Sequence, residues 1–117
     1  MSGAASVRKG KVWEREVARR LTELTGRTHE RVLTETRDGN VGDVTGGTPL
    51  VIQCKCKGTI DAYGAVMEAQ EAAHGTGRFA VAYLKRTRRG TPKEEIVALP
   101  REDWDEIVGL LVHNGVW

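Results

Sequence analysis

Residues 43–55 read Asp-Val-Thr-Gly-Gly-Thr-Pro-Leu-Val-Ile-Gln-Cys-Lys, and this stretch decides the expected fold. An acid leads into a Thr-Gly-Gly-Thr-Pro segment typical of a turn, and an apolar run follows it. The pattern predicts a hairpin whose second strand carries Gln53 and Lys55 on one face, because strand side chains alternate. Ile52 and Cys54 then point to the other face.

The side chains expected on that face suit a divalent cation and a phosphate. Magnesium prefers oxygen ligands, and Asp43 offers a carboxylate while Gln53 offers an amide oxygen. The cation polarises a phosphodiester and lowers the pKa of the attacking water. Lys55 can orient that water or stabilise the charged transition state. Alone, each residue is more often a turn aspartate or a solvated lysine, but the combination favours a metal-dependent nuclease site.

A helix is expected over residues 8–25, ending at Gly26. Its apolar positions recur at helical spacing, and they are Trp13, Val17, Leu21 and Leu24. At about 100° per residue, Glu14 lies closer to the centre of that face than Glu16. Glu16 lies on the opposite flank, where a carboxylate usually pairs with an arginine one turn later. Glu14 is therefore the expected second carboxylate, as a direct ligand or through water.

Residues 9–15, Lys-Gly-Lys-Val-Trp-Glu-Arg, resemble the K-G-x-x-x-E-R opening of the archaeal and phage Holliday junction resolvases. These enzymes belong to the PD-(D/E)XK nuclease superfamily. The resemblance extends from Arg8 to about Leu99. It matches Glu14 to the helix glutamate of the family, and Asp43 to the aspartate of the hairpin.

Two further positions belong to the same resemblance. Lys55 matches the lysine of the family pattern. Gln53 departs from it, since most members carry a glutamate there, and the lost charge is expected to weaken cation binding. The resemblance thus gives Glu14, Asp43 and Gln53 as metal ligands, and these three with Lys55 as the catalytic set.

The resemblance implies a restriction-endonuclease-like α/β fold, with a central mixed β-sheet flanked by helices. The elements expected from the sequence pattern, α-β-β-β-α-β-β-α, fit such a fold. It implies a Mg2+-dependent endodeoxyribonuclease, with Mn2+ as a substitute, that cuts four-way junctions in branched double-stranded DNA during recombination and repair. Paired cuts require two sites, so a homodimer is implied. A phage origin fits the compact size.

Two alternatives stay open. An aspartate followed by Gln-Cys-Lys also resembles the Mrr-like restriction endonucleases, so a restriction or repair enzyme is the first. In that group a separate recognition domain is usual, and its expected absence here favours readout of DNA shape and backbone. The second alternative is a non-catalytic DNA-binding module, in which Gln53 replaced the acid.

Positive charge is unevenly placed in a chain whose net charge is only +2. Basic clusters on a balanced domain suggest a polyanion partner. The residues expected to contact DNA are Arg8, Lys9, Lys11, Arg37, Asn40 and Lys57. Turn formation is the simpler role for Asn40, and solubility alone explains the basic run at 85–89 equally well.

The remaining pattern predicts the other elements. Strands are expected near residues 28–36, 41–45 and 50–57, with buried strands at 79–84 and 95–99. A helix with a small-residue face is expected over 62–74, and Pro100 opens a last helix. Trp104 on that helix is expected in the core, and Tyr63 is expected to pack on the sheet.

Composition fits one folded domain. With 39% hydrophobic and 29% charged residues, the chain is globular rather than disordered, so residues 1–117 are expected as a single nuclease domain. Residues 1–7 are expected as a flexible arm. Cys54 and Cys56 are expected as reduced, buried side chains. No apolar run approaches the roughly 20 residues of a membrane span, so an intracellular protein is expected, in the cytoplasm of a bacterial or archaeal cell.

Overall fold

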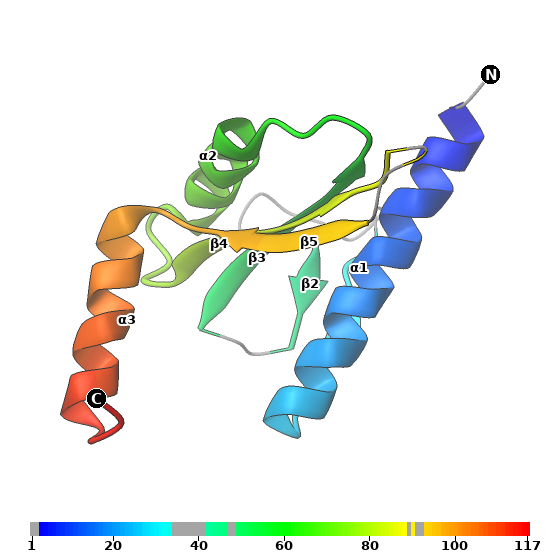
Figure 1. Cartoon of the computed structure of the whole chain (residues 1–117). Helices are drawn as coiled ribbons and strands as arrows, with labels where there is room; N and C mark the ends of the chain where they lie inside the picture. Colours follow the sequence, from blue (N-terminus) through cyan, green and yellow to red (C-terminus); the bar gives the residue numbers. More distant parts are fainter. Residues whose placement is uncertain (1–2, 34–41, 47–48, 89, 91–92) are drawn as a thin grey trace.

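The computed structural model describes residues 3–33, 42–46, 49–88, 90 and 93–117 (Figure 1). Over these residues the protein is mixed α/β, with three helices and a three-stranded mixed sheet. The elements are α1 (Gly3–Thr25), β1 (Glu30–Arg31), β2 (Val44–Thr45), β3 (Leu50–Lys57), α2 (Ala62–Ala73), β4 (Phe79–Arg86), β5 (Glu94–Ala98) and α3 (Arg101–His113). The predicted order of helices and strands is confirmed.

The central sheet has the strand order β3-β4-β5. β3 and β4 run parallel, from Leu50 opposite Phe79 to Lys57 opposite Arg86. β4 and β5 run antiparallel. Parallel neighbours need a crossover connection, and α2 supplies it between β3 and β4. The mixed sheet expected from the sequence is therefore present.

The predicted hairpin between β2 and β3 was wrong. β2 pairs antiparallel with β1 instead, with Arg31 opposite Val44. Within the described residues, the pairing that joins this segment to β3 is an isolated bridge of the parallel type, Gly42 to Ile52. The backbone N–H of Asp43 also donates to the carbonyl oxygen of Ile52 at 2.7 Å. The segment thus lies beside β3 without folding back on it as an antiparallel partner.

Two glycines shape the backbone on either side of β2. Gly42 and Gly46 flank β2, and their φ values are 76° and 134°. Residues other than glycine rarely adopt such positive φ values. A Cβ atom at Gly42 would lie 2.6 Å from the carbonyl oxygen of Ile52. The chain therefore bends on both sides of β2 and approaches β3 closely at Gly42.

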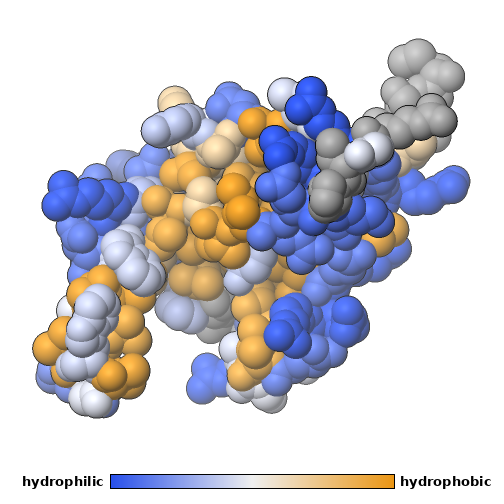
Figure 2. Space-filling model, viewed as in Figure 1, coloured by the Kyte–Doolittle hydropathy of each residue, from blue (hydrophilic) through white to orange (hydrophobic). Residues whose placement is uncertain are grey.

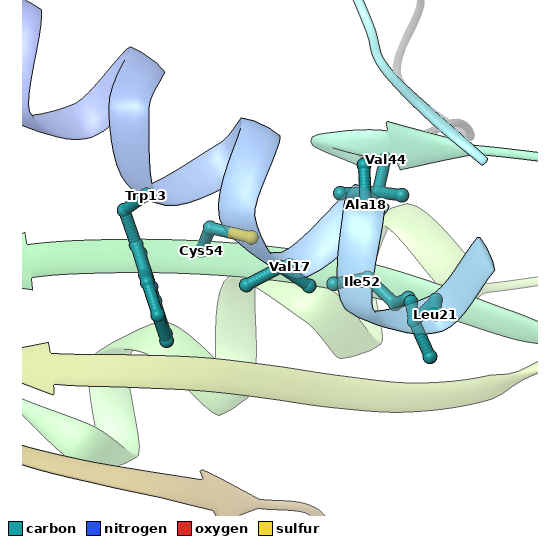
Figure 3. Packing of buried hydrophobic residues seen from close by; sticks show 7 residues of the cluster. All are labelled: Trp13, Val17, Ala18, Leu21, Val44, Ile52 and Cys54. Carbon is teal, nitrogen blue, oxygen red and sulfur yellow. The ribbon is translucent and has the colours of Figure 1, made fainter. Parts of the chain in front are cut away.

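Helix α1 covers one face of the sheet with large side chains (Figure 3). The cluster consists of Trp13, Val17, Ala18, Leu21, Val44, Ile52 and Cys54. The indole N–H of Trp13 also donates to the carbonyl oxygen of Tyr83 at 3.0 Å. The apolar face predicted for this helix is confirmed through Leu21, whereas Leu24 beyond it is exposed.

The start of α1 differs from the prediction. The helix begins at Gly3 rather than Arg8, so it includes most of the segment expected to precede it as an arm. Ala4 and Ala5 are strong helix formers, which extends the helix before its buried face begins. The helix ends as predicted, because Gly26 adopts a φ of 72°.

Helix α2 covers the other face with small side chains. Its buried residues, Ala65, Ala69 and Ala73, pack against β3 and β4. The carboxylate of Asp61 caps the helix by accepting the N–H of Gly64 at 2.9 Å. The predicted helix and its alanine face are confirmed. Because alanine side chains are small, the helix axis can lie close to the sheet. Longer side chains next to these alanines can then reach β3.

The C-terminal part of the chain is more exposed than predicted. Residues 94–97 of β5 are all exposed, so the expectation of a buried strand was wrong. α3 has no buried residue, and it projects away from the sheet (Figure 1). Trp104, expected in the core, is 47% exposed because no described element covers that side of the helix. The carboxylate of Asp103 anchors the first turn by accepting the N–H of Ala80 at 2.8 Å.

Tyr63 also departs from its prediction. It lies on the outer side of α2 and is 87% exposed, because the helix turns its alanines and not this residue toward the sheet. Across the described part of the chain, no helix has both the length and the apolar character that crossing a membrane requires.

Candidate functional site

The alternation of side chains along β3 divides them between the two helices. Ile52 and Cys54 belong to the cluster under α1, whereas Val51 packs against alanines of α2. Gln53 and Lys55 share the face of Val51 because they follow it by two and four residues. The prediction that Gln53 and Lys55 share one face is confirmed, and that face is covered by α2.

Gln53 and Lys55 converge on one carboxylate of α2. The Gln53 side-chain nitrogen, Nε2, donates to Oε2 of Glu68 at 3.2 Å. Nζ of Lys55 lies 2.8 Å from the same oxygen. Since Gln53 donates through its nitrogen, its amide oxygen is left without a hydrogen-bond donor among the described residues. An amide, an ammonium and a carboxylate therefore meet at one point on this face.

Asp43 lies against β3 at the level of Gln53. Its backbone N–H donates to the carbonyl oxygen of Ile52, and its Oδ2 accepts the N–H of Cys54, each at 2.7 Å. These two backbone groups directly flank Gln53. Asp43 is 2% exposed, and a backbone donor on the carboxylate offsets part of the cost of burying it. Three of the four predicted catalytic residues therefore lie along one short stretch of β3.

Glu14 lies on α1, which covers the opposite face of the sheet. Its Oε1 accepts from Nε of Arg31 at 3.0 Å, and the two side chains are 14% and 11% exposed. As predicted, Glu14 is more buried than Glu16, whose side chain is 38% exposed. The structure places Glu14 in an ion pair between α1 and β1, and not in contact with Gln53 or Lys55.

Glu16 has a different partner from the one expected. Instead of pairing with an arginine of its own helix, its Oε2 accepts from Nζ of Lys85 on β4 at 3.1 Å. Lys85 also lies over the ring of Trp13, 5.1 Å from its centroid. Burial acts to lower the pKa of Lys85, but Glu16, Glu95 and Cys56 outweigh that effect, so the pKa is raised. The ammonium is therefore held in its charged form.

The donors near β3 are those that a hard cation prefers. Among the residues that the structure describes, no group of three or more His, Cys, Asp and Glu side chains is arranged to hold a metal ion. The oxygens at hand come from Asp43, Gln53 and Glu68, and oxygen ligands suit Mg2+ or Mn2+. The softer ligand, Cys54, packs under α1 on the other face. The donor types therefore suit magnesium, with Glu68 hydrogen-bonded to the Gln53 side chain and Asp43 hydrogen-bonded to the backbone on either side of Gln53.

The residues predicted to bind DNA lie on two surfaces. Arg8 and Lys9 line a cavity of about 630 Å³ between α1 and the ends of β3 and β4. Further lysines and arginines of that cavity are Lys85, Arg88 and Lys93. Lys57 lines a separate cavity of about 310 Å³ beside Lys55 and Glu68. Lys11 is exposed on α1, and Arg37 and Asn40 lie outside the described residues.

Glu68 was not among the predicted site residues. A signal for it does exist in the sequence, because it follows Ala65 by three residues and directly precedes Ala69. At helical spacing it therefore lies on the flank of the small-residue face. A glutamate at that position points along the sheet toward the polar face of β3.

Comparisons of the chain with protein-family models, with curated proteins and with solved structures gave no match.

Proposed function

We propose that the protein is a metal-dependent, structure-selective DNA endonuclease that resolves four-way junctions by phosphodiester hydrolysis. The observation that carries the proposal is the convergence of Gln53 and Lys55 on one carboxylate, with Asp43 fixed beside Gln53. The order of helices and strands supports a restriction-endonuclease-like fold. Such a substrate implies action inside a bacterial or archaeal cell, in recombination and repair.

Each residue has a defined task in the proposed mechanism. Mg2+, or Mn2+ in its place, supplies charge neutralisation at the phosphate and activation of water when bound. Asp43 and Gln53 contribute oxygens to hold it. Lys55 donates to a phosphate oxygen or to the attacking water, which stabilises the negative charge that develops. Oε1 of Glu14 is paired with Arg31, so substitution of Glu14 is expected to affect cleavage less than that of Asp43.

The test is cleavage of a labelled four-way junction beside a linear duplex of the same sequence, in Mg2+ buffer. Wild type is compared with Asp43→Asn, which keeps an acceptor for the N–H of Cys54 but removes the charge. Glu23→Gln serves as the control, because it removes an exposed carboxylate of α1. Circular dichroism confirms that each variant is folded.

The outcomes separate the proposed activity from its alternatives. Symmetrical nicks across the junction, absent from the duplex and lost in Asp43→Asn alone, support resolution of junctions. Equal cutting of the duplex points to an Mrr-like restriction or repair enzyme. Junction binding without cleavage in either Mg2+ or Mn2+ points to a non-catalytic module.

The proposed activity requires a homodimer, and the C-terminal part of the chain offers a surface for it. Apolar side chains gather over α3 and over the middle of the molecule, where β4 and β5 lie (Figure 2). The exposed members on β5 and α3 are Ile96, Val97, Trp104, Leu110 and Val112. β5 is an edge strand, and an exposed edge readily pairs with another chain. A twofold axis through this surface would present two sites to the two strands that must be cut.

Light scattering coupled to gel filtration tests this surface. Wild type is expected as a dimer, and Val97→Lys with Trp104→Glu is expected as a monomer that binds a junction weakly. Tyr63→Glu is the control, since it places a charge on the exposed side of α2. A monomeric wild type that nonetheless makes paired cuts would contradict the dimer.

A further inference from the structure

We infer that Glu68 supplies, from α2, the metal-binding carboxylate that strand position 53 lacks. This inference rests on the proposed nuclease function and adds a ligand to it. Gln53 leaves β3 with a neutral oxygen where the resemblance expects a charged one. Glu68 brings a negative charge to the side chain of Gln53 itself, at 3.2 Å. Glu68 on α2 thus supplies the negative charge that Gln53 on β3 does not carry.

The geometry of Glu68 leaves oxygens for a cation. Both donors of β3, Gln53 Nε2 and Lys55 Nζ, contact a single oxygen of Glu68, Oε2. Within the described residues, Oε1 of Glu68 and the amide oxygen of Gln53 accept no hydrogen bond. Lys55 meanwhile neutralises the carboxylate and holds it in place when no cation is bound. Two oxygens, one on each of two hydrogen-bonded side chains, therefore remain for coordination.

An ordinary surface ion pair is the simpler explanation of the Lys55–Glu68 contact, and such pairs contribute little. Two observations argue for more than that. Lys55 is 27% exposed beside a Glu68 that is 50% exposed, and the pair lines a cavity of about 310 Å³. The other carboxylate of this cavity, Asp61, is engaged as the cap of α2 through the N–H of Gly64. Glu68 is the carboxylate of this cavity that bonds strand side chains rather than its own helix.

Mn2+ binding in the absence of DNA tests the inference, measured by electron paramagnetic resonance of the free ion and by calorimetry. Glu68→Gln is expected to weaken binding at least as much as the roughly 10- to 100-fold that follows loss of an outer-shell partner. Glu71→Gln is the matched control, because it is an exposed glutamate of the same helix. Its affinity for Mn2+ should equal that of wild type.

A rescue variant separates a ligand from a structural contact. Gln53→Glu with Glu68→Gln returns the carboxylate to the strand and keeps a polar partner on the helix. If Glu68 acts as a ligand, the double variant regains Mn2+ affinity that Glu68→Gln alone has lost. If Glu68 only holds Lys55 in place, the double variant stays as weak as the single one, and the inference is overturned.

The failure of this inference differs from failure of the proposed function. Mn2+ binding that Asp43→Asn abolishes and Glu68→Gln leaves unchanged overturns the role of Glu68 and keeps the nuclease site. Wild type that binds no Mn2+, with or without junction DNA, overturns both. Loss of binding in both variants, with rescue by Gln53→Glu in the Glu68→Gln background, supports both.

Discussion

The two faces of β3 differ in side-chain size, polarity and exposure, although they belong to the same eight residues. Under α1, Ile52 is fully buried among large side chains, including the ring of Trp13. Under α2, Val51 packs against alanines of the helix, and Gln53 and Lys55 contact the carboxylate of Glu68. The difference teaches that a shift of one residue along the strand moves a side chain from the hydrophobic core to a polar cluster beside α2.

The largest expected effect is a loss of stability caused by a substitution on the α1 face. Ile52→Ala removes buried methyl groups and leaves a cavity, so it should lower the free energy of unfolding by about 2–5 kcal/mol. Urea denaturation followed by circular dichroism measures this. Junction cleavage per folded molecule should be unchanged. A strong loss of cleavage in fully folded Ile52→Ala would break the separation of the two faces.

The second-largest expected effect is a loss of cleavage activity caused by a substitution on the α2 face. Lys55→Met keeps the apolar stem and removes the ammonium, so cleavage should fall by roughly 10²- to 10³-fold, or about 2.7–4 kcal/mol of transition-state stabilisation. The free energy of unfolding should change by no more than about 0.5 kcal/mol. Single-turnover cleavage of the junction measures the rate.

Lys57→Met sharpens that prediction as a comparison variant. Lys57 is exposed two residues further along the same face, so its loss should weaken junction affinity without slowing cleavage at saturation. Equal slowing of cleavage by both variants would show that positive charge in general, and not Lys55, is what the site requires.

A smaller effect is expected from Trp13→Phe on the α1 face. The phenyl ring keeps most of the packing but cannot donate to the carbonyl oxygen of Tyr83. Loss of this partner should lower the free energy of unfolding by about 1–2 kcal/mol. Trp104→Phe on exposed α3 should stay within about 0.5 kcal/mol of wild type. Equal changes in the two variants would mean that the hydrogen bond contributes nothing.

The smallest effect is a dependence on pH at the edge of the α1 face. The pKa of Lys85 is raised from its ordinary value of 10.5, so its pair with Glu16 stabilises the fold below that pH. The contribution is lost as the pH rises through the raised pKa. Glu16→Gln should therefore be less stable than wild type at pH 8, by well under about 1 kcal/mol. Urea denaturation at pH 8 and at pH 11 should show this difference shrinking, and a constant difference would contradict it.

Much of the fold follows from local patterns in the sequence. The apolar spacing of α1, the alanine face of α2 and the alternation along β3 are each set by contacts that recur at a fixed period. The order of the elements follows from the same periods and the glycines that end both helices. These features need no information about distant contacts, and all of them are present in the structure.

The errors arise where distant contacts or their absence decide the outcome. Nothing local shows that β2 pairs with β1, because Gly42 lies close to the backbone of Ile52 and Gly46 lies close to the backbone of Thr28 only once the chain has folded. Apolar spacing predicted a buried Trp104, but no described element covers α3. Glu68 was missed because a glutamate beside an alanine face is usually solvated. Its partners lie fifteen and thirteen residues earlier on a strand that the helix only reaches after folding.

The unequal burial of the three tryptophans gives the protein two distinguishable fluorescence signals, one from a buried indole and one from two exposed indoles. Trp13 is 5% exposed against the sheet, whereas Trp104 and Trp117 are 47% and 73% exposed near the C-terminus. Iodide in solution should quench the two C-terminal indoles and leave Trp13 emitting at shorter wavelength. Emission from Trp13 then follows the integrity of the α1 face alone. Quenching of the other two follows whatever covers α3, so core unfolding and surface association can be recorded in the same cuvette without a dye.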